Sequence, residues 1–312
     1  MNKSDRIDVR LGLKYPIIQG GMANIATGEF AAAVSNAGGL GLIAAGGMNV
    51  EQLEENIAKA KSLTDKPFGV NIMLMNPQAE QMADLVTNSG IAAVTTGAGN
   101  PGKYIGAWKE KGILVMPVMT STVIAKRLVR EGADYIIAEG CESGGHIGEM
   151  TTMSLIPQMV DALDVPVIAA GGIADGRQLL SAFILGAAGV QIGTVLLASN
   201  ECPIHANYKE AIIKSKDNDT IVTGRIGGTP VRVMKNQMAK EYVKREKEGA
   251  DVMELEKFTL GSLRRAVFDG DTKTGSLMAG QVSGMVNEIR PVAEILDSMV
   301  NEAKALSKSF EF

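Results

Sequence analysis

The chain repeats one pattern eight times: a short apolar run, a break rich in glycine or polar residues, and a stretch with helical periodicity. The apolar runs are continuous, as in parallel strands that are buried on both faces of a sheet. Successive runs start roughly 20 to 32 residues apart, which leaves room for a crossover helix between parallel neighbours. The predicted strands are 17–19, 41–44, 70–72, 93–95, 115–118, 135–138, 167–170 and 190–192.

The stretches between the runs have the features of helices. Residues 50–63 place Leu53, Ile57 and Ala60 on one face. Several predicted helices end at a glycine before the next strand: Gly90, Gly112, Gly132 and Gly186. Eight strand–helix units predict an α/β fold, a (β/α)8 TIM barrel. The alternative, an open doubly wound sheet, would carry Gly-x-Gly-x-x-Gly after its first strand, and the Gln-Gly-Gly-Met at 19–22 does not fit.

After the eighth run the pattern stops. Residues 206–285 are more charged, with helical and irregular stretches, whereas residues 292–307 again have the periodicity of an amphipathic helix. We therefore predict a barrel built from 1–205 plus 286–312 and a smaller lid segment, 206–285. The net charge is −4, but 207–265 hold 13 basic and 9 acidic residues, a local charge of +4. Such asymmetry is usually a solvated face and less often a docking surface for an acidic partner.

Composition narrows the class of protein. Hydrophobic residues make up 46% and charged residues 21%, ordinary values for a globular chain. No apolar run approaches the ~18 residues of a membrane span, and the N-terminus lacks the apolar core of a signal peptide. Cys141 and Cys202 are not at a metal-site spacing, and the basic residues are not interleaved with aromatic ones. We expect a cytoplasmic protein that binds neither membrane nor nucleic acid, and we assign no metal ligands.

One break contains one of only two histidines. It reads Glu-Gly-Cys-Glu-Ser-Gly-Gly-His-Ile-Gly over residues 139–148. An imidazole titrates near neutral pH, and the flanking glycines let the backbone approach a ligand closely. His146 is therefore a candidate for proton transfer or ligand orientation; the alternative is a loop histidine that caps a carbonyl. We expect the other histidine, His205, to be a structural hydrogen bonder.

The ends of the predicted strands carry the remaining signals, because the active site of such a barrel lies at the C-terminal ends of its strands. Gly171-Gly172 and Gly193-Thr194 follow the seventh and eighth runs, where free backbone N–H groups bind phosphate in many barrels. Either pair alone would suit a tight turn, but together they predict a phosphate-bearing ligand. The amides of Asn71 and Gln191 both donate and accept, which suits the edge of a planar ring.

These motifs resemble a known superfamily. The matching segments are QGGM (19–22), NAGGLGLI (36–43), DKPFGVNIML (65–74), TTGAGNP (95–101), EGCESGGHIGEMTTM (139–153), PVIAAGGIADG (166–176), QIGT (191–194) and MAGQ (278–281). Nearly the whole chain is similar to the FMN barrels that comprise nitronate monooxygenases and the FMN-dependent enoyl-acyl-carrier-protein reductases of the second type. Ile147 stands where nitronate monooxygenases commonly have arginine, which favours the reductase branch.

The resemblance implies roles for individual residues. His146 matches the active-site histidine, which would orient or protonate the substrate. The implied cofactor-binding residues are Gly21, Met22, Asn71, Glu139, Gly145, Ala170, Gly171, Gly172, Gln191, Gly193, Thr194, Met278, Gly280 and Gln281. The glycines and threonine at 171–172 and 193–194 would hold the FMN phosphate, and the last three residues would bring the lid segment to the flavin.

The resemblance also implies a reaction. NADH would reduce bound FMN, and the flavin would then reduce a trans-2-enoyl thioester on acyl carrier protein, the final step of bacterial type II fatty-acid elongation. A homodimer and a monovalent cation are implied on the same ground. One alternative is a nitronate monooxygenase, which uses FMN and O2. Another is a barrel without redox activity whose glycines bind a sugar phosphate.

Overall fold

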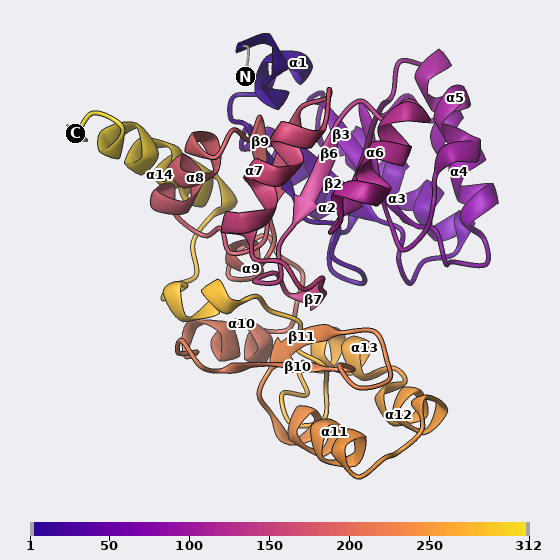
Figure 1. The fold of residues 1–312 in the computed structure, drawn as a ribbon, viewed down its shortest axis with the longest axis vertical. Coiled ribbons are helices and arrows are strands. Elements are labelled where there is room, and N and C mark those ends of the chain that lie inside the picture. Colours follow the sequence, from indigo (N-terminus) through magenta and orange to yellow (C-terminus); the bar gives the residue numbers. More distant parts are fainter. Residues whose placement is uncertain (1–2, 310–312) are drawn as a thin grey trace.

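The computed structural model describes residues 3–309, and its centre is a closed barrel of eight parallel strands (Figure 1). The strand order is β1-β9-β8-β6-β5-β4-β3-β2, and the two ends meet because Leu40 N donates to Ile17 O at 2.8 Å and Gln19 N donates to Leu40 O at 2.9 Å. The predicted TIM barrel is confirmed. Its strands are β1 (Ile17–Gln19), β2 (Gly41–Ala44), β3 (Phe68–Met73), β4 (Ala93–Gly97), β5 (Leu114–Met119), β6 (Ile136–Glu139), β8 (Val167–Ala170) and β9 (Gly189–Ile192).

Three of the eight predicted strands have the same bounds as in the structure. The runs at 17–19, 41–44 and 167–170 match at both ends. The run at 135–138 lies one residue early, because β6 continues to Glu139, which pairs with Ala170. A polar residue ends an apolar run in the sequence, but it does not end a ladder made by the backbone.

Helices surround the barrel and end where the sequence indicates. Helix α3 spans the predicted residues, has its predicted apolar face buried, and begins with a capping box between Asn49 and Gln52. Gly90, Gly112 and Gly132 follow helices with positive φ, which only glycine adopts without strain. The helices are α1 (Ile7–Leu11), α2 (Gly28–Asn36), α3 (Val50–Leu63), α4 (Ala79–Asn88), α5 (Gly102–Glu110), α6 (Thr122–Arg130), α7 (Thr152–Ala162), α8 (Gly176–Ile184) and α9 (Thr194–Leu197), after the 3-10 turn η1 (Lys3–Asp5).

The inside of the barrel has an apolar floor and a polar upper layer. The floor contains Ile18, Leu42, Met116, Ile137 and Ile168. Because successive side chains on a strand alternate between faces, the next inward-facing positions lie two residues further along. Polar side chains occupy several of these positions near the strand ends: Asn71, Thr95, Glu139 and Gln191.

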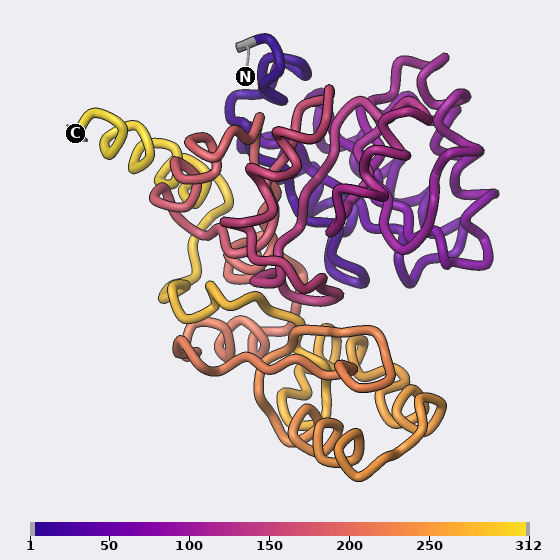
Figure 2. Tube along the Cα trace, viewed as in Figure 1, coloured from indigo at the N-terminus to yellow at the C-terminus, as the bar shows by residue number. Residues whose placement is uncertain are grey.

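The C-terminal helix α14 (Val292–Leu306) returns to the barrel and packs on α8 (Figure 2). The contact is close because a Cβ on Gly176 would lie 2.5 Å from Ala303 N, and the Glu302 carboxylate accepts from Gly176 N at 2.7 Å. The predicted helix at 292–307 is confirmed to within one residue. Among residues 3–309, no helix combines the length and the apolar character that crossing a membrane needs.

The lid segment lies against the open end of the barrel, below it in Figure 1. The sequence indicated helices and irregular stretches there, but the structure adds two strands, β10 (Thr220–Thr223) and β11 (Val231–Met234). They form an antiparallel sheet with β7 (Gly145–His146), which belongs to the barrel loop with the candidate histidine. The other elements are α10 (Ala206–Ile213), α11 (Gln237–Lys247), α12 (Val252–Thr259), α13 (Ser262–Phe268) and the 3-10 turn η2 (Gln281–Met285).

Candidate active site

A cavity of about 830 Å³ opens at the C-terminal ends of the barrel strands; we call it the barrel cavity. Its wall comes from the loops that follow the strands, with Leu263, Met278 and Val282 added from the lid segment. Every residue implicated by the sequence lines it except Gly280 and Gln281. Those that line it are Gly21, Met22, Asn71, Glu139, Gly145, His146, Ala170, Gly171, Gly172, Gln191, Gly193, Thr194 and Met278.

One side of the cavity presents backbone N–H groups. Gly171 and Gly172 have φ values of 92° and 72°, and among residues 3–309 their N–H groups donate to no carbonyl or side chain. A Cβ on Gly171 would lie 2.7 Å from Gly140 O, so the turn accepts only glycine. Gly193 precedes the short helix α9, whose first N–H groups have no partner within the helix. These loops bring together the donors that the sequence predicted for a phosphate.

The inner wall presents two amides. Asn71 Oδ1 accepts from Thr95 Oγ1 at 2.8 Å, which leaves the Asn71 NH2 group as a donor for a ligand. The Gln191 side chain is buried, and its Oε1 has no hydrogen-bond partner within residues 3–309. Buried acceptors of this kind are rarely left unpaired in a working protein. Gly21 lies so close to the Asn71 side chain that a Cβ would overlap it.

Glu139 adds a group that titrates near neutrality. It is half-buried at the end of β6 and lines the cavity. Burial raises the pKa of the Glu139 carboxyl to about 7, while the Ser143 hydroxyl acts weakly in the opposite direction. Ser143 Oγ has no hydrogen bond of good geometry among residues 3–309, so desolvation dominates. The family resemblance predicts that Glu139 lies near the cofactor, but it says nothing about the protonation of this carboxyl group.

His146 projects an unpaired imidazole into the barrel cavity. The side chain is exposed and lines the cavity, and no side chain or carbonyl in residues 3–309 hydrogen-bonds to it. The surrounding protein limits its hydration, which lowers the pKa of His146 below its ordinary value. The imidazole is therefore neutral at pH 7, with one N–H donor and one acceptor nitrogen for a ligand. The capping alternative is not what the structure shows for this side chain; His205, in contrast, caps α10 by accepting from Asn207 N at 3.1 Å.

The loop of residues 139–148, here the His146 loop, is held in place by neighbouring segments. The Glu142 carboxylate accepts from Thr152 N at 2.9 Å and 3.0 Å, and Glu142 O accepts from Gln281 N at 2.9 Å. A Cβ on Gly144 would lie 2.6 Å from Ala279 C. Gly280 N donates to Thr194 Oγ1 at 2.9 Å. The implicated pair 280–281 thus lies behind the cavity wall and supports it.

Sequence reasoning did not single out Arg232, Glu142, Thr152 or Arg127. Within residues 3–309, Arg127 is the only lysine or arginine in the wall of the barrel cavity, and it pairs with Glu131 at 2.9 Å. Arg232 lies in β11 and donates to Cys141 O within the His146 loop. An arginine between apolar residues in the run Val-Arg-Val-Met was the available signal for burial, but its partner is distant in the sequence.

Comparison with known proteins is consistent with this geometry. The sequence model of the nitronate monooxygenase family matches residues 5–302. A probable nitronate monooxygenase of Staphylococcus saprophyticus is 34% identical over 98% of this chain and 99% of its own. An octahydroindene-carboxyl-CoA dehydrogenase of Mycobacterium tuberculosis is 30% identical over 94% of each chain. The structure of FabK from Thermotoga maritima superposes with a TM-score of 0.94 at 46% identity, over 97% of this chain and 96% of that one.

Proposed function

The chain belongs to the nitronate monooxygenase family, and on that premise we propose that it reduces trans-2-enoyl thioesters of acyl carrier protein with NADH, through bound FMN. The family and the FabK relatives make it an FMN oxidoreductase. The observation that carries the finer proposal is its 46% identity with FabK, the FMN-dependent enoyl-acyl-carrier-protein reductase of the second type. The relative named for a coenzyme A ester supports a thioester substrate as well.

The residues of the barrel cavity fit FMN. The N–H groups of Gly171, Gly172 and Gly193 would hold its phosphate. The free Asn71 NH2 group and the unpaired Gln191 Oε1 would bind donors and acceptors at the edge of its ring system. When bound, FMN supplies the hydride transfers, and the protein supplies placement and electrostatics.

His146 would act on the thioester. Hydride addition to the β-carbon moves negative charge to the thioester oxygen, and the α-carbon then takes a proton. Because the imidazole is neutral at pH 7, we propose that its N–H donates a hydrogen bond to that oxygen and so orients the substrate. Glu139, half protonated near pH 7, would hold a proton within the same cavity.

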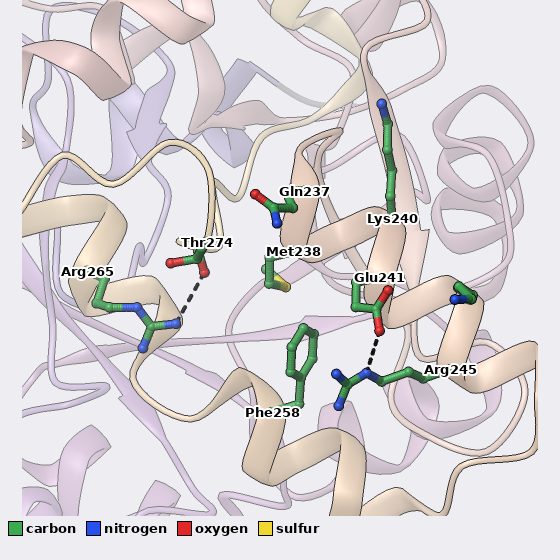
Figure 3. Close-up of a pocket in the computed structure, with 9 residues that line it drawn as sticks. Gln237, Met238, Lys240, Glu241, Arg245, Phe258, Arg265 and Thr274 are labelled. Carbon is green, nitrogen blue, oxygen red and sulfur yellow. Dashed lines mark hydrogen bonds and ion pairs between the residues drawn. The ribbon is translucent and has the colours of Figure 1, made fainter.

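A groove in the lid segment is our candidate for the carrier's docking surface. It has a volume of about 580 Å³ and lies between α11, α12 and α13 (Figure 3). Arg245 pairs with Glu241 at 2.8 Å and lies 4.3 Å from the Phe258 ring centroid. Four cationic side chains and one carboxylate line the groove. The complete lining is Gln237, Met238, Lys240, Glu241, Lys244, Arg245, Phe258, Arg265 and Thr274.

The position of this lid groove suits an acidic carrier protein. Helix α13 separates it from the barrel cavity, because Leu263 lines the cavity and Arg265 lines the groove. Lys240 and Lys244 are exposed, and Lys240 forms no ion pair within residues 3–309. Charge complementarity of this kind mainly steers association and sets specificity. We therefore propose that acyl carrier protein docks here, one helix away from the thioester site.

Nitronate oxidation with O2 is the second candidate, because the family model and the staphylococcal relative bear that name. The same cavity, FMN site and histidine would serve it. The sugar-phosphate alternative loses its support, because the chain is an FMN oxidoreductase. The NADH donor, the homodimer, the monovalent cation and a cytoplasmic location stay predictions.

The deciding experiment measures NADH oxidation by the FMN-loaded protein under anaerobic conditions, with and without crotonyl-coenzyme A or a longer enoyl thioester. We expect rapid oxidation only when the thioester is present. NADH oxidation that ignores the thioester, together with nitronate consumption once air is admitted, would assign the chain to the monooxygenase branch.

A further inference from the structure

Arg232 is a buried cation without a paired anion. The residue is 6% exposed, and it forms no ion pair with a carboxylate in residues 3–309. Burial lowers the pKa of Arg232 and the negative charge of Glu142 acts in the opposite direction, but the Glu142 carboxylate is hydrogen-bonded to Thr152 instead. Removing a guanidinium from water is costly unless hydrogen bonds replace the hydration. Hydrogen bonds must therefore take the place of a carboxylate at this position.

The Arg232 guanidinium donates two of its three hydrogen bonds to one carbonyl of the His146 loop. Nε and Nη2 both donate to Cys141 O, at 3.1 Å and 2.8 Å, and Nη1 donates to Thr220 Oγ1 at 3.3 Å. Two donors of a rigid fork on one oxygen constrain the direction of that carbonyl more tightly than a single donor would.

The same strand holds the loop at a second point. In the ladder between β7 and β11, Arg232 pairs with Gly145 and Val231 pairs with His146. The segment from Cys141 to His146 is thus fixed at its beginning by the Arg232 side chain and at its end by the β11 backbone. The path between these points determines where the imidazole enters the barrel cavity.

We propose that Arg232 is a positioning residue: its fork on the Cys141 carbonyl sets the His146 loop and thereby places the His146 imidazole against the substrate. This inference rests on the proposed role of His146, but not on which family reaction the protein catalyses. It makes the geometry of the active site depend on the lid segment. A purely structural arginine would lower stability when it is replaced, but it would leave the rate of the folded, FMN-loaded protein unchanged.

The test compares Arg232→Met and Arg232→Lys with Arg264→Met as the matched control, because Arg264 is exposed on α13 outside the cavity and the lid groove. Each FMN-loaded variant is examined by rapid mixing: flavin reduction by NADH, then flavin reoxidation by crotonyl-coenzyme A. We expect Arg232→Met to retain FMN and flavin reduction by NADH, but to slow reoxidation by about 10- to 100-fold, the scale of a small misplacement. Arg232→Lys, which keeps the charge but not the fork, should be slowed less.

A double-mutant cycle with His146→Ala shows whether Arg232 acts through the histidine. In the His146→Ala background, Arg232→Met should slow reoxidation no further, because the group that it positions is gone. An equal additional loss in that background, or a rate for Arg232→Met equal to that of Arg264→Met, would overturn the proposal. Should Arg232→Met fail to bind FMN, Arg232→Lys decides: a full rate overturns the proposal, and a slowed rate with FMN bound supports it.

The two proposals fail in different ways. If the unmodified protein does not reduce enoyl thioesters, the proposed function is wrong, and the same cycle is then run on nitronate oxidation in air. If it does reduce them and the cycle shows no coupling, only the positioning role is wrong.

Discussion

The backbone of His146 pairs with that of Val231, so the candidate catalytic histidine lies in a ladder with a strand of the lid segment. Most barrel loops are held by their own strand and helix. Here the loop after β6 completes a three-stranded sheet whose other two strands come from the lid segment. The lid segment therefore shapes the candidate active site as well as contributing Met278 to its wall.

Replacing the histidine tests the proposed hydrogen bond to the thioester. We expect His146→Ala to retain FMN, because the imidazole makes no hydrogen bond within residues 3–309, and to lower kcat for enoyl reduction by at least ~100-fold. His205→Asn is the matched control, since asparagine also caps helices well and His205 caps α10. Steady-state rates and the flavin absorbance of both variants give the result. Unchanged turnover in His146→Ala would rule out the role.

The protonation state of His146 determines how we expect kcat to change at acid pH. Because limited hydration lowers the pKa of His146, the neutral form persists below the ordinary histidine value. We expect kcat to hold through pH 6.5 and to decline only at lower pH. A decline centred at or above the ordinary value would show that the imidazole acts in its charged form.

Glu139 links stability to pH. Its pKa is raised in the folded protein to about 7 from 4.5, so the folded state binds more protons than the unfolded state between these values. The free energy of unfolding therefore falls as pH rises through this window. Glu139→Gln removes the effect, and we expect its stability relative to the parent to increase from about pH 4.5 to pH 7 and then stay level. Urea unfolding at a series of pH values measures this; a constant difference would show that the Glu139 pKa is normal.

A methyl group at the phosphate turn should interfere with cofactor binding. Gly171→Ala puts a side chain on a residue with φ of 92° and 2.7 Å from Gly140 O. We expect FMN to bind about 5- to 150-fold more weakly, since strain of this kind costs about 1–3 kcal/mol. Gly106→Ala is the control, because a Cβ there meets nothing within 4 Å and alanine favours the surrounding helix. Fluorescence titration with FMN separates the two; equal affinities would contradict the proposed phosphate site.

Charge reversal in the lid groove tests the docking proposal. We expect Lys240→Glu combined with Lys244→Glu to raise KM for enoyl thioesters on acyl carrier protein several-fold, and to leave KM for coenzyme A thioesters unchanged. The effect should shrink at high salt, because these side chains are exposed. Lys59→Glu combined with Lys61→Glu, on the exposed face of α3, provides a charge-matched control. An equal change for both classes of thioester would reject this groove as the docking surface.

Local sequence features predicted much of the barrel and its phosphate turn. Residues 167–170 are apolar throughout and are bounded by Pro166 and Gly171, so this strand could be delimited without a structure. Gly171 and Gly172 could be assigned to the cavity because the C-terminal ends of barrel strands share one face. The three-stranded sheet could not be predicted, because β7 has two residues and its partner β11 is far away in the chain.

The sequence by itself determined the elements whose signals are short-ranged: periodicity sets helices and strands, and glycine permits the turns between them. The tertiary structure alone decided the properties that arise when distant segments meet. The Arg232 fork reaches Cys141 only because the lid segment folds over the barrel. The Glu139 carboxyl titrates near pH 7 only because burial removes its water. Both depend on desolvation and on contacts across long sequence separations, which no local pattern of residues encodes.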